Sequence, residues 1–100
     1  MNQIQEYNKT TFEEIKHINQ FGNEYWYARE LQVALEYREW RKFYGVITKA
    51  EEACTNSKVK VSDHFVQTAK MVEIGSGAKR KQVDYELSRY ACYLIVQNAD

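Results

Sequence analysis

Apolar residues recur at helical spacing in two adjoining segments near the start of the chain. Phe12, Ile15 and Ile18 lie on one side of residues 11–19, which predicts a short helix there. A second helix is predicted to begin near Tyr27, because the residues that follow it also place their apolar side chains on one face. The first third of the chain is therefore predicted to be helical.

The clearest helical pattern belongs to the segment REWRKFYGVITKAEEAC. Its apolar positions follow the i, i+3, i+4, i+7 rule of a helix with one buried face, and they include Trp40, Phe43, Tyr44, Ile47, Ala50 and Cys54. Only a short link around Glu36–Arg38 separates this segment from the preceding helix. This spacing is compatible with a helix–turn–helix geometry.

The periodicity breaks at CTNSKVKV, which predicts a loop before the second half of the chain. Ser62 or Asp63 is suited to cap a further helix over about residues 63–71, which is predicted to bury Phe65, Ala69 and Val72. Beyond it, residues 71–74 and 82–87 flank a glycine-containing turn and are predicted to form the two strands of a small hairpin.

Ser88 is suited to cap a last helix, RYACYLIVQN, whose apolar residues surround its axis. We expect this helix to be buried on several sides, either in a longer protein of which this chain is the N-terminal part or in a homo-oligomer formed through residues 88–98. The pattern as a whole predicts one α+β domain over residues 1–100, predominantly helical, with about five helices and a small β-hairpin near residues 71–87. Residues 1–10 are polar and are expected to be loose.

Charge changes this picture because it is unevenly distributed. The 100 residues have a formal net charge of zero, which counts against a dedicated nucleic-acid-binding domain without excluding one. However, residues 37–50 contain four cations and one acid, whereas residues 1–36 contain three cations and six acids. The neutral total therefore hides a basic segment that follows an acidic one.

Cysteine usage and the apolar runs indicate a cellular compartment. Cys54 and Cys92 fall on apolar positions of predicted helices, where free cysteine behaves as a small hydrophobe. The first ten residues lack the basic-then-apolar order of a signal peptide. No apolar run approaches the roughly 20 residues that span a bilayer. These features predict a cytoplasmic protein without a membrane partner.

The stretch GSGAKRKQ, residues 75–82, is the first candidate for chemistry. Its glycine and lysine spacing does not fit a phosphate-binding loop or a dinucleotide fingerprint. One interpretation is a hairpin turn in which Gly75 and Gly77 adopt positive φ and the cations lie in water. The other is a basic hairpin tip in which Lys79, Arg80 and Lys81 contact a phosphate backbone.

The second candidate is YREWRKF, at the start of the predicted third helix. Arg38, Arg41 and Lys42 lie opposite or beside its apolar face, and a basic helix start after a tight turn is suited to a DNA groove. Cations at a helix N-terminus oppose the helix dipole, which favours a functional reason for them, although a solvated face is the simpler interpretation.

Enzymatic and metal chemistry are not indicated. Asp63 and His64 are neighbours and would not face each other on a helix. The four histidines and cysteines, namely His17, Cys54, His64 and Cys92, lack any metal-ligand spacing. We therefore predict no catalytic residue, no metal and no cofactor.

Three stretches together carry a family resemblance: FEEIKHINQFGNEYW, YARELQVALEYREWRKFYGVITKAEEAC and DHFVQTAKMVEIGSGAKRKQVDYELSRYACYLIVQNAD. In this order they resemble the N-terminal part of the bacterial DNA-damage-inducible protein D family, which is related to the BRO N-terminal domains. The resemblance covers roughly residues 12–100 and is most specific at LSRYACYLIVQN. It implies a mostly helical domain with a small β element, a link to the SOS response, and DNA binding.

Two functional hypotheses of different classes follow. The first is a non-enzymatic DNA-damage-response module that binds single- or double-stranded DNA, or a DNA-bound protein, through Arg38, Arg41, Lys42, Lys79, Arg80, Lys81 and Arg89. The second is a protein-interaction module that regulates a recombinase filament without direct DNA contact. The second fits a neutral composition and would be favoured by an exposed apolar patch.

Overall fold

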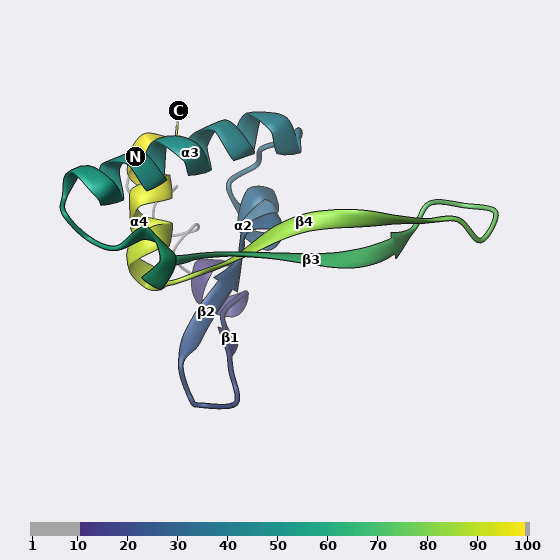
Figure 1. Cartoon of the computed structure of the whole chain (residues 1–100), viewed down its shortest axis with the longest axis horizontal. Coiled ribbons are helices and arrows are strands. Elements are labelled where there is room, and N and C mark those ends of the chain that lie inside the picture. The colour runs from purple at the N-terminus through teal and green to yellow at the C-terminus, as the bar shows by residue number, and fades with distance from the viewer. Residues whose placement is uncertain (1–10, 100) are drawn as a thin grey trace.

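The computed structural model describes residues 11–99. Residues 11–14 are helical, and the remaining elements are β1 (His17–Ile18), β2 (Glu24–Tyr27), α2 (Ala28–Ala34), α3 (Trp40–Asn56), the 3-10 helix η1 (Val61–Asp63), β3 (Phe65–Glu73), β4 (Lys79–Leu87) and α4 (Arg89–Asn98). The helices cluster at one end of the molecule, and a long hairpin projects from them (Figure 1).

One antiparallel sheet, in the order β1-β2-β4-β3, organises the strands. Strands β3 and β4 pair along their whole length, from Phe65 opposite Leu87 to Glu73 opposite Lys79. Strand β2 pairs with β4 only at Glu86 and Leu87. Within the described part of the chain, the outer part of the β3–β4 hairpin therefore has no third strand beside it, and it extends away from the body of the domain (Figure 1).

The hydrophobic core lies where α3 and α4 pack together over the inner end of the hairpin. Trp26, Phe43, Ile47, Leu87 and Ile95 are fully buried there and come from β2, α3, β4 and α4. Cys54 and Cys92 are also buried, and both are free thiols. Helix α2 and strand β3 also contribute buried side chains, so six elements together form a single core.

The prediction of a predominantly helical fold with about five helices and a small hairpin is wrong, because a four-stranded antiparallel sheet forms a large part of the domain. The largest error concerns residues 63–71, which were predicted to be a helix. They contribute to η1 and β3 instead, and of the predicted buried face only Phe65 is buried. Nine backbone pairs with β4 stabilise the extended conformation, and sequence periodicity does not reveal such long-range pairs.

The predicted helix over residues 11–19 is also only partly correct. The helical conformation ends at Glu14, and residues 17–18 form β1, with His17 paired to Tyr25 of β2. The loop predicted at CTNSKVKV begins later than expected, because α3 continues to Asn56. The expectation that residues 1–10 are loose concerns residues outside those that the structure describes.

Other predictions are confirmed. Helices α2, α3 and α4 occur where the apolar periodicity placed them. The Ser88 side chain caps α4 by accepting a hydrogen bond from the backbone N–H of Ala91 at 3.0 Å. Across residues 11–99, no helix combines the length and apolar character that a bilayer crossing demands.

Candidate nucleic-acid interface

The outer part of the hairpin, residues 70–82, is here named the arm. Its turn is tight: the backbone N–H of Ala78 donates to the carbonyl of Gly75 at 2.9 Å. The two central residues, Ser76 and Gly77, have φ of 51° and 76°, and Gly75 has φ of 102°. Two central residues with positive φ are typical of a type I′ turn, whose twist matches that of paired strands. The predicted positive φ of both glycines is confirmed.

The arm has four cations and one acid. The cations Lys70, Lys79, Arg80 and Lys81 are exposed, and none of them makes an ion pair with any residue in the range 11–99. Strand alternation divides them between two faces. Because Met71 pairs with Lys81 and Val72 with Arg80, each face of the arm combines cations with an apolar side chain.

A second basic group lies at the start of α3. Arg38, Arg41 and Lys42 are exposed and, like the arm cations, have no ion-pair partner within the described part of the chain. Glu39 is the N-cap residue, but its side chain makes no capping hydrogen bond, and the first turn of α3 contains no acid. Three cations therefore lie beside the positive end of the helix dipole, where an anion would be stabilised.

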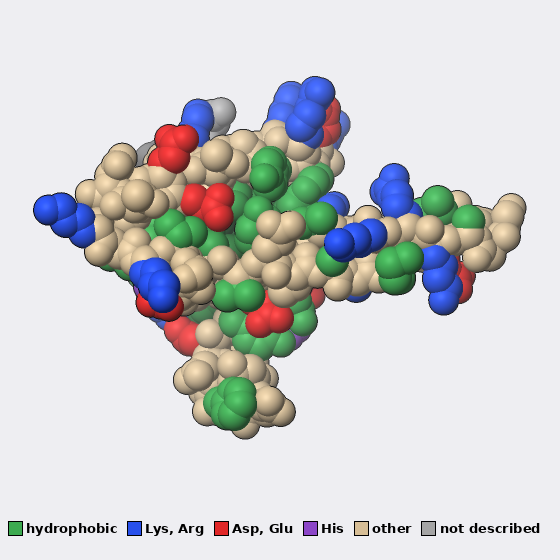
Figure 2. Space-filling view, viewed as in Figure 1, with side chains coloured by type: hydrophobic (Ala, Val, Ile, Leu, Met, Phe, Trp, Pro, Cys, Tyr) green, Lys and Arg blue, Asp and Glu red, His purple; other side chains and the backbone are tan. Residues whose placement is uncertain are grey.

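Arg29 joins the two basic groups. Its Nε donates to the backbone carbonyl of Val83 in β4 at 2.9 Å, and its guanidinium lies over the ring of Trp40, 4.0 Å from the centroid. Burial lowers the pKa of the Arg29 guanidinium below its ordinary value. The inner end of the arm and the first residue of α3 are thereby fixed relative to each other. Figure 2 shows Lys and Arg side chains along the arm and over the start of α3, on one side of the molecule.

Asp84 supports the same junction from β4. Its side chain is almost fully buried, and Oδ1 accepts hydrogen bonds from the backbone N–H of Arg29 at 3.0 Å and of Tyr85 at 2.7 Å. Because Arg29 is in the first turn of α2, Asp84 acts as a capping residue supplied by a neighbouring strand. A helix end and a strand are thus held together by one buried carboxylate.

Asp84 and Glu86 also line a cavity of about 390 Å³, together with Glu30 and Lys70. Carboxylates clustered near a lysine in a cleft are the arrangement that a nuclease would need. Here Asp84 caps α2, and Glu30 lies 2.7 Å from His17 Nε2. Within residues 11–99, no group of three or more His, Cys, Asp or Glu is placed to hold a metal ion.

Arg89 is the one predicted site residue that lies apart from the two basic groups. Its guanidinium makes two hydrogen bonds to Glu24, at 2.7 and 2.9 Å, and donates from Nη1 to Glu13 at 2.9 Å. These bonds lower the pKa values of both carboxyl groups and raise the pKa of Arg89. Two carboxylates thus already neutralise Arg89, which links α4 to β2 and to the helical residues before β1.

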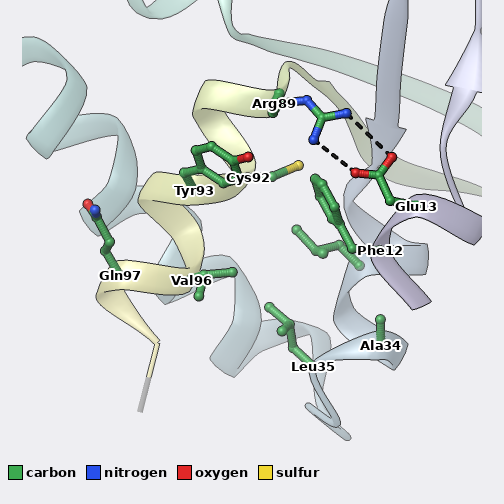
Figure 3. A pocket seen from close by; sticks show the side chains of 10 residues that line it. Phe12, Glu13, Ala34, Leu35, Arg89, Cys92, Tyr93, Val96 and Gln97 are labelled. Carbon is green, nitrogen blue, oxygen red and sulfur yellow. Dashed lines mark hydrogen bonds and ion pairs between the residues drawn. The ribbon is translucent and has the colours of Figure 1, made fainter. Parts of the chain in front are cut away.

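Figure 3 shows the Arg89–Glu13 pair at the edge of an apolar groove between α2 and α4. The groove has a volume of about 420 Å³ and is lined mainly by apolar side chains, including Phe12, Leu31, Leu35, Cys92, Tyr93 and Val96. Tyr93 and Val96 are about half exposed, at 52% and 51%. Helix α4 is therefore buried on the side of Ala91, Leu94 and Ile95 but leaves an apolar strip uncovered.

Sequence reasoning missed Arg29 and Lys70. The predicted helix over residues 63–71 includes Lys70, whereas the strand pairing places Lys70 on the same face of the arm as Arg80. The only sequence signal for Arg29 was a cation in the first turn of a predicted helix. Val83 and Trp40, which it contacts, lie 54 and 11 positions away in the sequence, and a local pattern cannot reveal such contacts.

The fold and the exposed basic groups define a small α+β domain with a projecting β-hairpin, and the chain belongs to the family described as BRO family, N-terminal domain, which matches residues 14–100. It is 56% identical over 89 residues to DNA damage-inducible protein D of Escherichia coli (strain K12). The match covers 89% of this chain and 32% of that protein, so the chain spans about a third of the length of this curated relative. No solved structure matches. The family resemblance predicted from the sequence is confirmed.

Proposed function

We propose that this domain is a non-enzymatic DNA-binding module of the DNA-damage response, and that it holds DNA between the arm and the start of α3. One observation carries the proposal: Arg29 fixes two exposed groups of unpaired cations on one side of the molecule. The proposed contact residues are Arg38, Arg41, Lys42, Lys70, Lys79, Arg80 and Lys81. Arg89 is left out because Glu13 and Glu24 occupy its donors.

The shape of the arm supports DNA as the partner. A two-stranded β-ribbon can enter either the major or the minor groove of B-DNA. Lysine and arginine side chains on both faces of the ribbon would reach phosphates on either side of the groove, and the start of α3 would contact the adjoining backbone. The name of the E. coli relative supports a role in the damage response, and such a module would act in the cytoplasm, beside the bacterial chromosome.

Removing the cations of the arm tests the proposal. We expect the triple variant Lys79→Ala, Arg80→Ala, Lys81→Ala to bind duplex DNA more weakly at every sequence, because phosphate contacts release counterions without reading bases. The slope of log affinity against log salt should decrease in magnitude by up to about 3, at roughly 0.9 for each lost contact. A fluorescence-anisotropy titration of labelled duplex between low and moderate salt would measure both effects.

The matched control is Lys49→Ala, Lys58→Ala, Lys60→Ala, which removes the same charge from α3 and the loop after it. Residues 58–60 lie at the opposite end of the molecule from the arm (Figure 1). We expect its salt dependence to match that of the unmodified protein. Equal losses in both triple variants would show that only net charge matters, and an unaltered arm variant would refute the proposed surface.

A second candidate function is supported by the apolar groove between α2 and α4. A groove of about 420 Å³ beside half-exposed Tyr93 and Val96 suits a protein contact, either with a recombinase filament or with a second copy through residues 88–98. A salt titration of single- and double-stranded DNA, with and without recombinase, separates the two candidates. Binding that requires the recombinase at every salt concentration would favour the protein-interaction module.

A further inference from the structure

The arm exposes large apolar side chains that contribute nothing to the core of the domain. Met71 is 61% exposed and Ile74 is 55% exposed. Strand β4 runs from the turn toward the body of the domain, and Val83 is the hydrophobic residue nearest the turn that packs against the core cluster. Met71 and Ile74 lie beyond it, on a two-stranded ribbon that none of the other elements in residues 11–99 covers (Figure 1).

Cross-strand packing explains the apolar side chains at two positions of the arm but does not explain the third. Met71 is opposite Lys81 and Val72 is opposite Arg80, so each can pack along the aliphatic part of a cross-strand partner. Ile74 follows the last pair, and its backbone N–H bonds to the carbonyl of Ala78. Its only cross-strand neighbour is therefore a methyl group, and its side chain is left at the end of the arm.

The charges around these residues identify the kind of partner. Lys70 and Arg80 lie on the same face as Val72, as the pairing register shows, and the adjacent position on that face is Ile74. This face of the arm contains no acid, because the only acid of the arm, Glu73, is on the other face opposite Lys79. An apolar tip beside two unpaired cations suits a partner with anionic groups on its outside and apolar groups inside. Duplex DNA is such a partner, because its phosphates lie outside and its stacked bases lie inside.

We propose that Ile74, supported by Val72, is a wedge that enters between base pairs, so that the arm prefers duplex DNA whose stacking is already weakened. This inference rests on the proposed DNA binding by the arm. Proteins that insert Ile, Leu, Met or Phe between base steps must unstack those steps, and the cost is lowest at a mismatched or damaged position. The cations hold the backbone while the apolar tip replaces a stacking contact.

The test compares two 20-base-pair duplexes of the same sequence, one fully paired and one with a central mismatch next to 2-aminopurine. We expect the unmodified domain to bind the mismatched duplex roughly tenfold more tightly and to increase the fluorescence of 2-aminopurine as its stacking is lost. The variant Ile74→Ser should lower the preference to less than about twofold, while its affinity for the paired duplex stays within about twofold, because its cations are unaltered.

The control variant is Val66→Ser, which removes an exposed apolar side chain from β3 near the body of the domain. It should keep the mismatch preference. Two results would overturn the wedge alone. One is a mismatch preference that Ile74→Ser leaves unaltered, and the other is salt-dependent binding of the unmodified domain without any mismatch preference. The absence of salt-dependent binding to either duplex would overturn the proposed function as well. Loss of recruitment by a recombinase in Ile74→Ser, with no mismatch preference in the unmodified domain, would assign the tip to a protein contact instead.

Discussion

At the scale of single residues, the two partly buried arginines have different tasks. Arg29 lies over Trp40 and donates to the Val83 carbonyl, so it positions the arm against α3. Arg89 binds Glu13 and Glu24 and links elements of the body. Arginine suits both tasks because its planar fork stacks on a ring and binds carboxylates in a bidentate manner. Neither task requires a ligand.

The Arg89 cluster predicts how stability depends on pH. Arg89 lowers the pKa values of Glu13 and Glu24 below the ordinary value of 4.5 in the folded state. Their contribution to stability is therefore fully present above about pH 4.5 and is lost as the pH falls through the lower, folded-state values. We expect Arg89→Met to lower the free energy of unfolding at pH 7. The decline of this free energy toward pH 3 should also be less steep, because up to about one proton fewer for each carboxyl group is taken up on unfolding.

Chemical denaturation at a series of pH values between 7 and 3 would measure this effect. Glu14→Gln is the control, since Glu14 is exposed and makes no ion pair within residues 11–99. Its pH profile should match that of the unmodified protein. Parallel profiles for Arg89→Met and the unmodified protein would show that the cluster does not stabilise the fold.

At the scale of elements, the arm and α3 differ in how they are supported. Helix α3 buries Phe43, Val46, Ile47, Ala50 and Cys54 against the rest of the core. The arm has only its own cross-strand pairs and its turn, and an isolated hairpin is marginally stable in water. We therefore expect the arm to open locally, at a lower free energy than the body of the domain.

Two glycine substitutions test this difference. Gly77 has φ of 76°, a conformation that alanine disfavours, so Gly77→Ala should destabilise the turn by about 1–2 kcal/mol. Because the arm does not contribute to the core, we expect this cost to lower the protection of arm amides against hydrogen exchange while the global unfolding free energy changes little. Coincident loss of protection in α3 and the arm would show that the hairpin is part of the cooperative core.

Gly45 provides the opposite case within α3. A Cβ added at Gly45 would meet no atom within 4 Å, and the residue lies inside a helix. Gly45→Ala should therefore raise the global unfolding free energy by roughly 0.5–1 kcal/mol, because alanine loses less backbone entropy in a helix. Thermal unfolding of the two variants side by side would show a shift for Gly45→Ala and almost none for Gly77→Ala.

At the scale of the whole molecule, a net charge of zero conceals separate surfaces. The basic surface consists of the arm and the start of α3, whereas the acids Glu13 and Glu24 are paired with Arg89 in the body. The apolar groove between α2 and α4 begins at the same Arg89–Glu13 pair (Figure 3). DNA contact and protein contact are therefore proposed to use different parts of the molecule.

This separation predicts independent effects of mutation. Val96→Lys places a charge in the groove, and we expect it to weaken self-association or recombinase binding by at least about tenfold, because the buried cation would have no partner. Its affinity for duplex DNA should stay within about twofold. The arm triple variant should show the converse pattern, and sedimentation velocity combined with anisotropy would measure both. A Val96→Lys variant that loses DNA affinity as strongly as the arm variant would contradict the separation.

The sequence predicted those parts of the fold that depend on local contacts. The apolar periodicity located α2, α3 and α4, and the Gly-Ser-Gly stretch indicated a tight turn. Periodicity failed for residues 65–73, because Phe65, Ala69 and Val72 match a helical spacing by coincidence while the backbone pairs with a strand. The candidate cations at 79–81 were visible in sequence, but Lys70 required the correct strand pairing.

The sequence by itself determined the helical stripes, the turn and the candidate cations at 38–42 and 79–81, since each of these depends on residue types within one segment. It also determined the family, through three stretches of the chain taken together. Only the tertiary structure decided that the hairpin extends beyond the body, that Arg29 joins the arm to α3, and that Arg89 is neutralised by Glu13 and Glu24. These features depend on contacts between residues far apart in the chain. Whether a cation is free or paired is therefore decided by packing, and that difference separates the proposed DNA surface from an internal ion cluster.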